Sequence, residues 1–176
     1  MRYRRAWVPG GTYFFTVNLA SRRERCLTEH IDLLRDSVRR VRRAHPFEIV
    51  AWVVLPDHMH AVWVLPPEDT DFAMRWNQIK GAFSRALPKT ETVSTSRVHK
   101  RERGIWQRRF WEHLVRDQDD LARHVDYVHY NPVKHGYVER AVEWPFSSFH
   151  HYVRRGWLAE DWGCAEDFEG DFGEGR

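Results

Sequence analysis

The stretch FEIVAWVVLPDHMHAVWVL, residues 47–65, decides the fold. It holds two apolar runs, rich in β-branched and aromatic residues, on either side of Pro56-Asp57. Near-continuous apolar runs are typical of strands covered on both faces, and a proline followed by an aspartate favours a turn. The stretch therefore predicts a tight hairpin of two central strands, 47–55 and 58–65, and Pro66-Pro67 ends the second.

The residues on either side of this hairpin alternate between strand and helix patterns. β-forming residues predict two further strands, and apolar residues three and four apart predict amphipathic helices. We expect strands at 12–19 and 105–115, helices at 28–43, from 72 to near Pro88 and from 119 or 120 to near Pro132, and a polar surface loop at 89–103. This order predicts an α+β fold, an antiparallel sheet with helices packed on one side.

The charge is unevenly distributed along the 176 residues, which suffice for one domain. Lys and Arg number 28 and Asp and Glu 25, but seven of the acids and only one base lie in residues 159–176. Residues 1–158 therefore carry 27 bases and 18 acids, a formal charge of +9, and the last eighteen residues carry −6. We expect a basic domain, 1–158, that binds a polyanion in a basic groove. We also expect an acidic tail, 159–176, that competes with the polyanion for this groove.

The remaining composition excludes two classes of protein. Two cysteines, Cys26 and Cys164, provide neither a disulfide framework nor a four-cysteine zinc site, and they fit a reducing cytoplasm. No apolar run approaches the roughly 18 residues of a membrane span. We therefore expect a cytoplasmic protein without a membrane partner.

His58-Met59-His60 is the sharpest chemical feature. On a strand, residues i and i+2 point to the same face, about 6.6 Å apart along the chain. Two imidazoles so placed can bind one metal ion, and Asp57 can orient one of them from outside. Such a pair also occurs as ordinary packing, and a third ligand has to come from elsewhere.

Tyr127 and Asn131 form the second candidate. If their segment is helical, they lie four residues apart on one face. The Asn131 amide oxygen could complete a His-His-Asn set around Mg²⁺ or Mn²⁺. A tyrosine beside such an ion could attack a phosphodiester and form a covalent phosphotyrosine. The alternative is that Tyr127 and Tyr130 are packing residues beside a helix end at Gly136.

The two candidates occur within four segments that follow one another in a specific order. The segments are Trp52-Val-Val-Leu-Pro-Asp-His-Met-His60, Ile105-Trp-Gln-Arg-Arg-Phe-Trp-Glu-His113, Tyr127-Val-His-Tyr-Asn-Pro-Val-Lys-His-Gly136 and Trp144-Pro-Phe-Ser-Ser-Phe149. In these segments the chain resembles the REP-associated tyrosine transposases, relatives of the single-strand insertion-sequence transposases in the HUH nuclease superfamily. The likeness runs from about Tyr3 to Trp162, and only 89–103 is longer than the family needs.

The resemblance implies roles for individual residues. His58 and His60 stand where the family has its metal-binding histidines, Tyr127 matches the nucleophile, and Asn131 matches the polar residue that completes the metal site. The implied fold is ferredoxin-like, with the histidine pair on a central strand. The implied substrate is single-stranded DNA with hairpins of repetitive extragenic palindromes (REPs), each flanked by a recognition tetranucleotide.

Several basic and aromatic side chains are candidates for DNA contacts, because phosphate donors beside stacking platforms suit a single strand. The candidates are Arg4, Arg5, Trp7, Arg22, Arg23, Arg108, Arg109 and Lys134. The protein would be nucleoid-associated, and both a monomer and a homodimer are compatible with the sequence.

These observations predict a metal-dependent single-strand DNA endonuclease and strand transferase that acts on REP-type hairpins through a 5′-phosphotyrosine. One alternative is a non-catalytic protein that binds REP hairpins. Another is a metallohydrolase of small phosphoesters, in which water attacks and Tyr127 is incidental.

Overall fold

The computed structural model describes residues 7–21, 25–89, 99 and 103–163, and its centre is a sheet of four strands. The strands are β1 (Thr12–Asn18), β2 (Glu48–Val54), β3 (His58–Val64) and β4 (Trp111–Leu114). Their order is β2-β3-β1-β4, and every neighbouring pair is antiparallel. This is the order that two interleaved β-α-β units produce, so the predicted α+β, ferredoxin-like fold class is confirmed.

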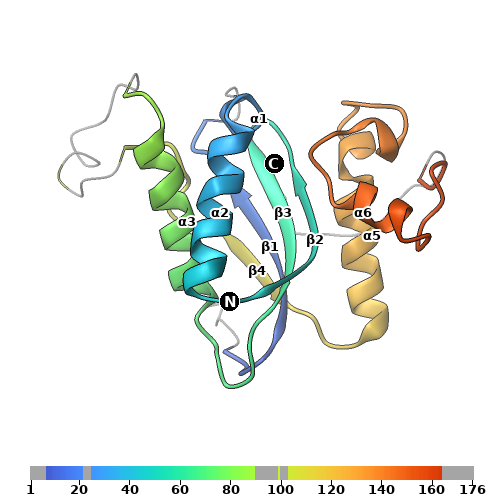
Figure 1. The fold of residues 1–176 in the computed structure, drawn as a ribbon, viewed down its shortest axis with the longest axis horizontal. Coiled ribbons are helices and arrows are strands. Elements are labelled where there is room, and N and C mark those ends of the chain that lie inside the picture. Colours follow the sequence, from blue (N-terminus) through green and yellow to red (C-terminus); the bar gives the residue numbers. More distant parts are fainter. Residues whose placement is uncertain (1–6, 22–24, 90–98, 100–102, 164–176) are drawn as a thin grey trace, which may run out of the picture.

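Helices cover both faces of the sheet (Figure 1). Two crossover helices, α2 (Ile31–Ala44) and α3 (Phe72–Ala86), pack together on one face, and α5 (Gln118–Lys134) packs on the other. The prediction that the helices pack on one side of the sheet is confirmed for α2 and α3. It is wrong for α5, which packs on the other face. Shorter elements complete the fold: α1 (Cys26–Glu29), η1 (Ala141–Glu143) and α6 (Phe149–Arg154).

The strands explain why both faces are covered, because their apolar residues alternate between two cores. Tyr13 and Phe15 of β1 belong to the core beneath α2 and α3. Phe14 belongs to a second core, with Val62 of β3 and Val128 of α5. A sheet that is apolar on both faces needs a cover on each.

The predicted hairpin is confirmed, and its turn closes with a hydrogen bond of 2.8 Å from Leu55 N to His58 O. The predicted strand 105–115 lies at the edge of the sheet and is interrupted. Trp106 makes a single bridge to Leu19, and regular pairing with β1 resumes only at Trp111, opposite Thr16. The chain takes three residue steps from Leu19 to Thr16 but five from Trp106 to Trp111 on the edge segment. The two extra residues therefore form a bulge in the edge segment.

The other boundaries shift by a few residues. Predicted helix 28–43 is divided at His30 into α1 and α2. Helix α5 begins after Asp117, whose side chain accepts a bond of 2.8 Å from Asp120 N. The helix continues past Pro132 to Lys134, because a proline near the end removes only one helical hydrogen bond. Gly136, with φ of +67°, then turns the chain away.

Parts of two predicted segments lie outside the described residues: 90–98 and 100–102 of the polar loop, and 164–176 of the acidic tail. The division between domain and tail at residue 158 stays a prediction. Trp162 packs its ring against Phe149 of α6, with centroids 5.8 Å apart. Within the described ranges, no helix combines the length and the apolar character needed to cross a membrane.

Candidate functional site

His58 and His60 project from β3 toward α5 and are buried, with exposures of 1% and 0%. Their ring centroids lie 5.1 Å apart. Asp57 Oδ1 contacts His58 Nδ1 at 2.7 Å, and Thr16 Oγ1 of the neighbouring strand contacts His60 Nδ1 at 3.0 Å. Each ring is therefore oriented from its Nδ1 side, the arrangement that supports metal-binding histidines.

His58 has one nitrogen suited to a metal ion. A carboxylate only accepts hydrogen bonds, so Nδ1 carries the proton that faces Asp57 and Nε2 carries a lone pair. His58 Nε2 is buried and has no hydrogen-bond partner among the described residues. A buried polar atom without a partner is costly, and a divalent ion would satisfy it. The ligand atoms present therefore fit a divalent metal ion. They do not distinguish Mg²⁺ from Mn²⁺.

Tyr127 of α5 lies against His60, with ring centroids 5.3 Å apart, and is 1% exposed. Its hydroxyl accepts a hydrogen bond of 2.9 Å from Lys134 Nζ, and the same ammonium lies 4.6 Å from its ring centroid. Lys134, seven residues later, thus reaches back along the helix to the phenol. The positive charge of Lys134 therefore lies beside the phenolic oxygen.

Asn131 lies one turn beyond Tyr127 on the buried face of α5, with an exposure of 0%. At the end of the helix, His135 contacts His58, with ring centroids 5.1 Å apart. Tyr127 thus lies beside His60 and His135 beside His58, so Asn131, midway between them, faces the histidine pair. The structure brings together three of the residues that the sequence predicted, His58, His60 and Tyr127, and Asn131 lies one turn further along the same buried face of α5.

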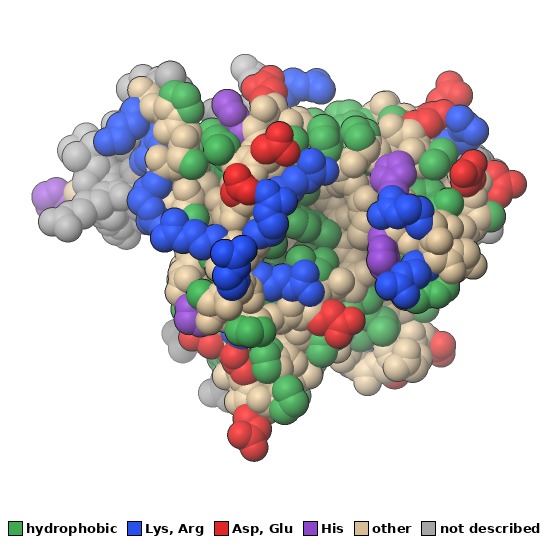
Figure 2. All heavy atoms as spheres, in the orientation of Figure 1, with side chains coloured by type: hydrophobic (Ala, Val, Ile, Leu, Met, Phe, Trp, Pro, Cys, Tyr) green, Lys and Arg blue, Asp and Glu red, His purple; other side chains and the backbone are tan. Residues whose placement is uncertain are grey.

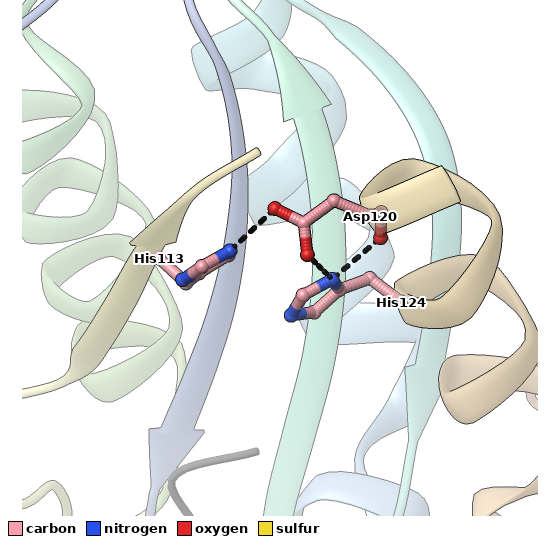
Figure 3. A group of neighbouring side chains, drawn as sticks. All are labelled: His113, Asp120 and His124. Atoms are coloured by element: carbon pink, nitrogen blue, oxygen red, sulfur yellow. Dashed lines mark hydrogen bonds and ion pairs between the residues drawn. The ribbon is translucent and has the colours of Figure 1, made fainter. Parts of the chain in front are cut away.

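A second histidine cluster lies on the same face of the sheet (Figure 3). Asp120 Oδ2 contacts His113 Nε2 at 2.8 Å, and the Asp120 backbone oxygen contacts His124 Nδ1 at 2.7 Å. The two imidazoles stack, with centroids 4.6 Å apart. His113 belongs to β4 and the other two residues to α5, so the cluster joins the start of the helix to the edge of the sheet.

The hydrogen bonds of this cluster argue against a metal ion. A carboxylate and a backbone carbonyl only accept, so the nitrogens of His113 and His124 that face Asp120 carry protons. Arg116 Nε also lies 3.1 Å from Asp120 Oδ2. Burial by itself would raise the pKa of Asp120, but hydrogen bonds from Arg116 and His113 outweigh it and hold that pKa well below its usual range. Asp120 is therefore ionised and already neutralised by its neighbours.

The predicted DNA contacts are only partly described. Arg4, Arg5, Arg22 and Arg23 lie outside the described residues. Trp7 stacks one face on Phe72, with centroids 4.8 Å apart, and is half-exposed. Arg108 and Arg109 are exposed at the bulge of the edge strand. Figure 2 shows further Lys and Arg side chains gathered over α2 and α3.

A family model described as "Transposase IS200 like" matches residues 11–131, from the start of β1 to Asn131. The chain belongs to this family. An Escherichia coli K12 relative named REP-associated tyrosine transposase is 48% identical over 167 residues, which cover 94% of this chain and 93% of the relative. A Haemophilus influenzae relative is 48% identical over 168 residues, 95% of this chain and 96% of its own.

A solved structure of a REP-associated tyrosine transposase bound to a REP hairpin is similar over the whole of this transposase. The TM-score is 0.85 and the sequence identity 46%, and the match covers 100% of this chain and 97% of the other. This chain therefore belongs with the REP-associated tyrosine transposases, as the sequence motifs indicated, and is an enzyme of the transposase class.

The sequence did not reveal two contacts of the transposase site, and it did not reveal the second histidine cluster. Thr16 is 44 residues from His60 and meets it only through the β1–β3 register. Lys134 was predicted to contact DNA, a role that stays a prediction, and its ammonium lies on Tyr127. The second cluster could have been found from a helical spacing. Asp120 and His124 lie on the same helix face as Tyr127 and Asn131.

Proposed function

We propose that this transposase is a metal-dependent single-strand DNA endonuclease and strand transferase that acts on REP-type hairpins in the nucleoid. The observation that carries the proposal is the position of the Tyr127 hydroxyl, bonded to Lys134 Nζ at 2.9 Å on a ring that contacts His60. The REP hairpin bound by the structural relative supports the substrate class.

His58, His60 and Asn131 would hold the divalent ion. When bound, the ion supplies a Lewis acid that polarises a phosphate oxygen. In the reaction, Tyr127 Oη forms a bond to phosphorus, the bond from phosphorus to O3′ breaks, and the departing oxygen takes up a proton. The products are a free 3′-hydroxyl and a 5′-phosphotyrosine, and the phenol proton goes to solvent. Attack by a 3′-hydroxyl on the phosphotyrosine reverses these changes and restores Tyr127.

The first experiment tests the nucleophile. A hairpin with single-stranded flanks, labelled at its 3′ end, is incubated with Mn²⁺ or Mg²⁺, and covalent adducts are resolved on a denaturing gel. Tyr127→Phe should abolish the adduct and lower cleavage at least about a thousandfold, while hairpin affinity stays the same. Tyr130→Phe is the matched control and should retain both activities.

Cleavage by Tyr127→Phe at the wild-type rate would refute the assignment. Hairpin binding by the wild type without an adduct under any metal condition would favour the non-catalytic hairpin-binding protein. Cleavage without an adduct would favour attack by water.

A second experiment tests Lys134. Without its ammonium the phenolate loses a charge-assisted hydrogen bond, so Lys134→Met should slow cleavage about 10- to 100-fold at neutral pH. The rising limb of the pH–rate profile should move to higher pH, and the deficit should shrink there. Lys134→Arg should restore part of the rate. An equal deficit at every pH, with weaker hairpin binding, would show that Lys134 contacts DNA and does not act on Tyr127.

A further inference from the structure

A basic pocket of about 410 Å³ lies on the α3 side of the sheet, outside the site described above. One wall is the C-terminal half of α3, and the other is the segment 103–108 that leads into the edge strand. Its lining residues include Asn77, Lys80, Gly81, Arg85, Gln107 and Arg108.

The two walls are tied to each other. Lys80 Nζ donates to the Gln107 carbonyl at 2.8 Å, and Trp106 Nε1 donates to the Lys80 carbonyl at 3.2 Å and to Ser84 Oγ at 3.1 Å. Arg103 donates to the carbonyls at the end of α3, including that of Ser84. The pocket is therefore held in shape without a ligand, which lowers the cost of binding one.

The lining combines two kinds of chemistry. Among the described residues that form it, four are cationic and none is acidic: Lys80, Arg85, Arg103 and Arg108. Asn77 and Gln107 add side-chain amides, each with a donor and an acceptor. Cations suit a phosphate, and amides pair with the exposed edge of a base. The volume falls within the usual range for a small ligand.

The pocket lies two strand spacings from β3 within the sheet, on the opposite face from the side chains of His58 and His60. Gln107 N donates to the carbonyl of Asn18 at 3.0 Å, and Asn18 stands directly opposite His58 in the β1–β3 pair. Neighbouring strands are about 4.8 Å apart, so the pocket wall runs roughly 10 Å from β3. A DNA strand that leaves the histidine pair can therefore reach the pocket around the bulged edge, where Arg108 and Arg109 are exposed.

We propose that this pocket holds one nucleotide of the single strand that flanks the hairpin and selects its base. The amides of Asn77 and Gln107 contact the base edge, and Arg85 and Arg108 hold the phosphate at the rim. An unpaired base presents the edge that such a pocket reads, whereas a base inside a duplex does not. The proposal rests on the proposed single-strand substrate and deepens it, because it locates sequence selection outside the catalytic site.

The test blocks the pocket without touching the core. A Cβ added at Gly81 meets only the flexible guanidinium of Arg85, at 3.2 Å, so Gly81→Trp can fill the space. Fluorescence anisotropy then compares a hairpin with its single-stranded flank and the same hairpin trimmed to the duplex. Gly81→Trp should weaken binding of the flanked hairpin about tenfold or more and leave the trimmed hairpin unchanged. Ala86→Trp, on the exposed end of the same helix, is the control and should alter neither.

A second arm tests base selection by varying one flank position at a time. The wild type should prefer one base at one position by about tenfold, and Asn77→Ala and Gln107→Ala should reduce that preference to about twofold or less. Equal affinities of wild type and Gly81→Trp for the flanked hairpin would overturn the proposal. Binding of a free deoxynucleotide as tightly as the flanked hairpin would also overturn it, because the pocket would then serve a soluble nucleotide.

These measurements use the Tyr127→Phe background without metal, so they are independent of cleavage. If Gly81→Trp weakens binding of the flanked hairpin but the wild type never cleaves DNA, only the proposed endonuclease is refuted. If the wild type cleaves DNA but Gly81→Trp leaves binding of the flanked hairpin unchanged, only the proposed pocket is refuted.

Discussion

Two histidine clusters lie on the same face of the sheet, on either side of the Phe14 ring. Phe14 is 5.5 Å from His60 in one cluster and 4.7 Å from His124 in the other, measured between ring centroids. Both clusters are buried except for the partly exposed His113, and both pair imidazoles with one aspartate. Composition and burial alone would assign them the same chemistry.

The hydrogen bonds separate them. In the first cluster Asp57 binds His58 from outside, so Nε2 turns inward with a lone pair. In the second, Asp120 bridges the two stacked rings at one edge, and the nitrogens of His113 and His124 that face it carry protons. In the proposed function, the position of the carboxylate leaves a nitrogen of the first pair available for an ion, whereas in the second cluster it joins the helix to the edge of the sheet.

The largest expected difference between the clusters is in metal affinity. His58→Ala removes a proposed ligand and should weaken Mn²⁺ binding by at least about a hundredfold, measured by isothermal titration calorimetry. His113→Ala, the matched change in the second cluster, should leave the affinity within about twofold. A comparable loss from His113→Ala would place the ion at the second cluster and reverse the comparison.

A smaller effect is expected from the residue that orients the first cluster. Asp57→Asn keeps the shape of the side chain but removes the charge that fixes the His58 proton, and it should weaken Mn²⁺ binding about 10- to 100-fold. The protein should remain folded by circular dichroism. An unchanged affinity would mean that His58 needs no partner to bind the ion.

The second cluster should affect stability and leave metal affinity unchanged. Asp120→Asn breaks a buried network and should lower the free energy of unfolding by about 3 kcal/mol at pH 7, measured by urea denaturation. Because the folded state holds the pKa of Asp120 below its unfolded value of about 3.9, its contribution is complete above that pH and is lost as pH falls further. The variant should therefore show a flatter loss of stability below about pH 4. A slope equal to that of the wild type would contradict the assigned role.

Local patterns sufficed for much of the site and fold. The hairpin 47–65, the shared face of His58 and His60, and the i,i+4 relation of Tyr127 and Asn131 all depend on short-range geometry. The Thr16 contact depends on strand register, and the position of Lys134 Nζ depends on how a long side chain packs. The helix α5 was predicted, but its position on the second face was missed although Phe14, Val53 and Val62 were visible, because an apolar strand does not say which helix covers it.

The burial of Tyr127 also bears on the lifetime of the proposed covalent product. The phosphotyrosine would form at a residue that is 1% exposed without DNA, and hydrolysis competes poorly in a site that excludes solvent. The energy of the broken phosphodiester would then be kept until a 3′-hydroxyl arrives. In the proposed reaction, a buried nucleophile favours rejoining of strands over their degradation.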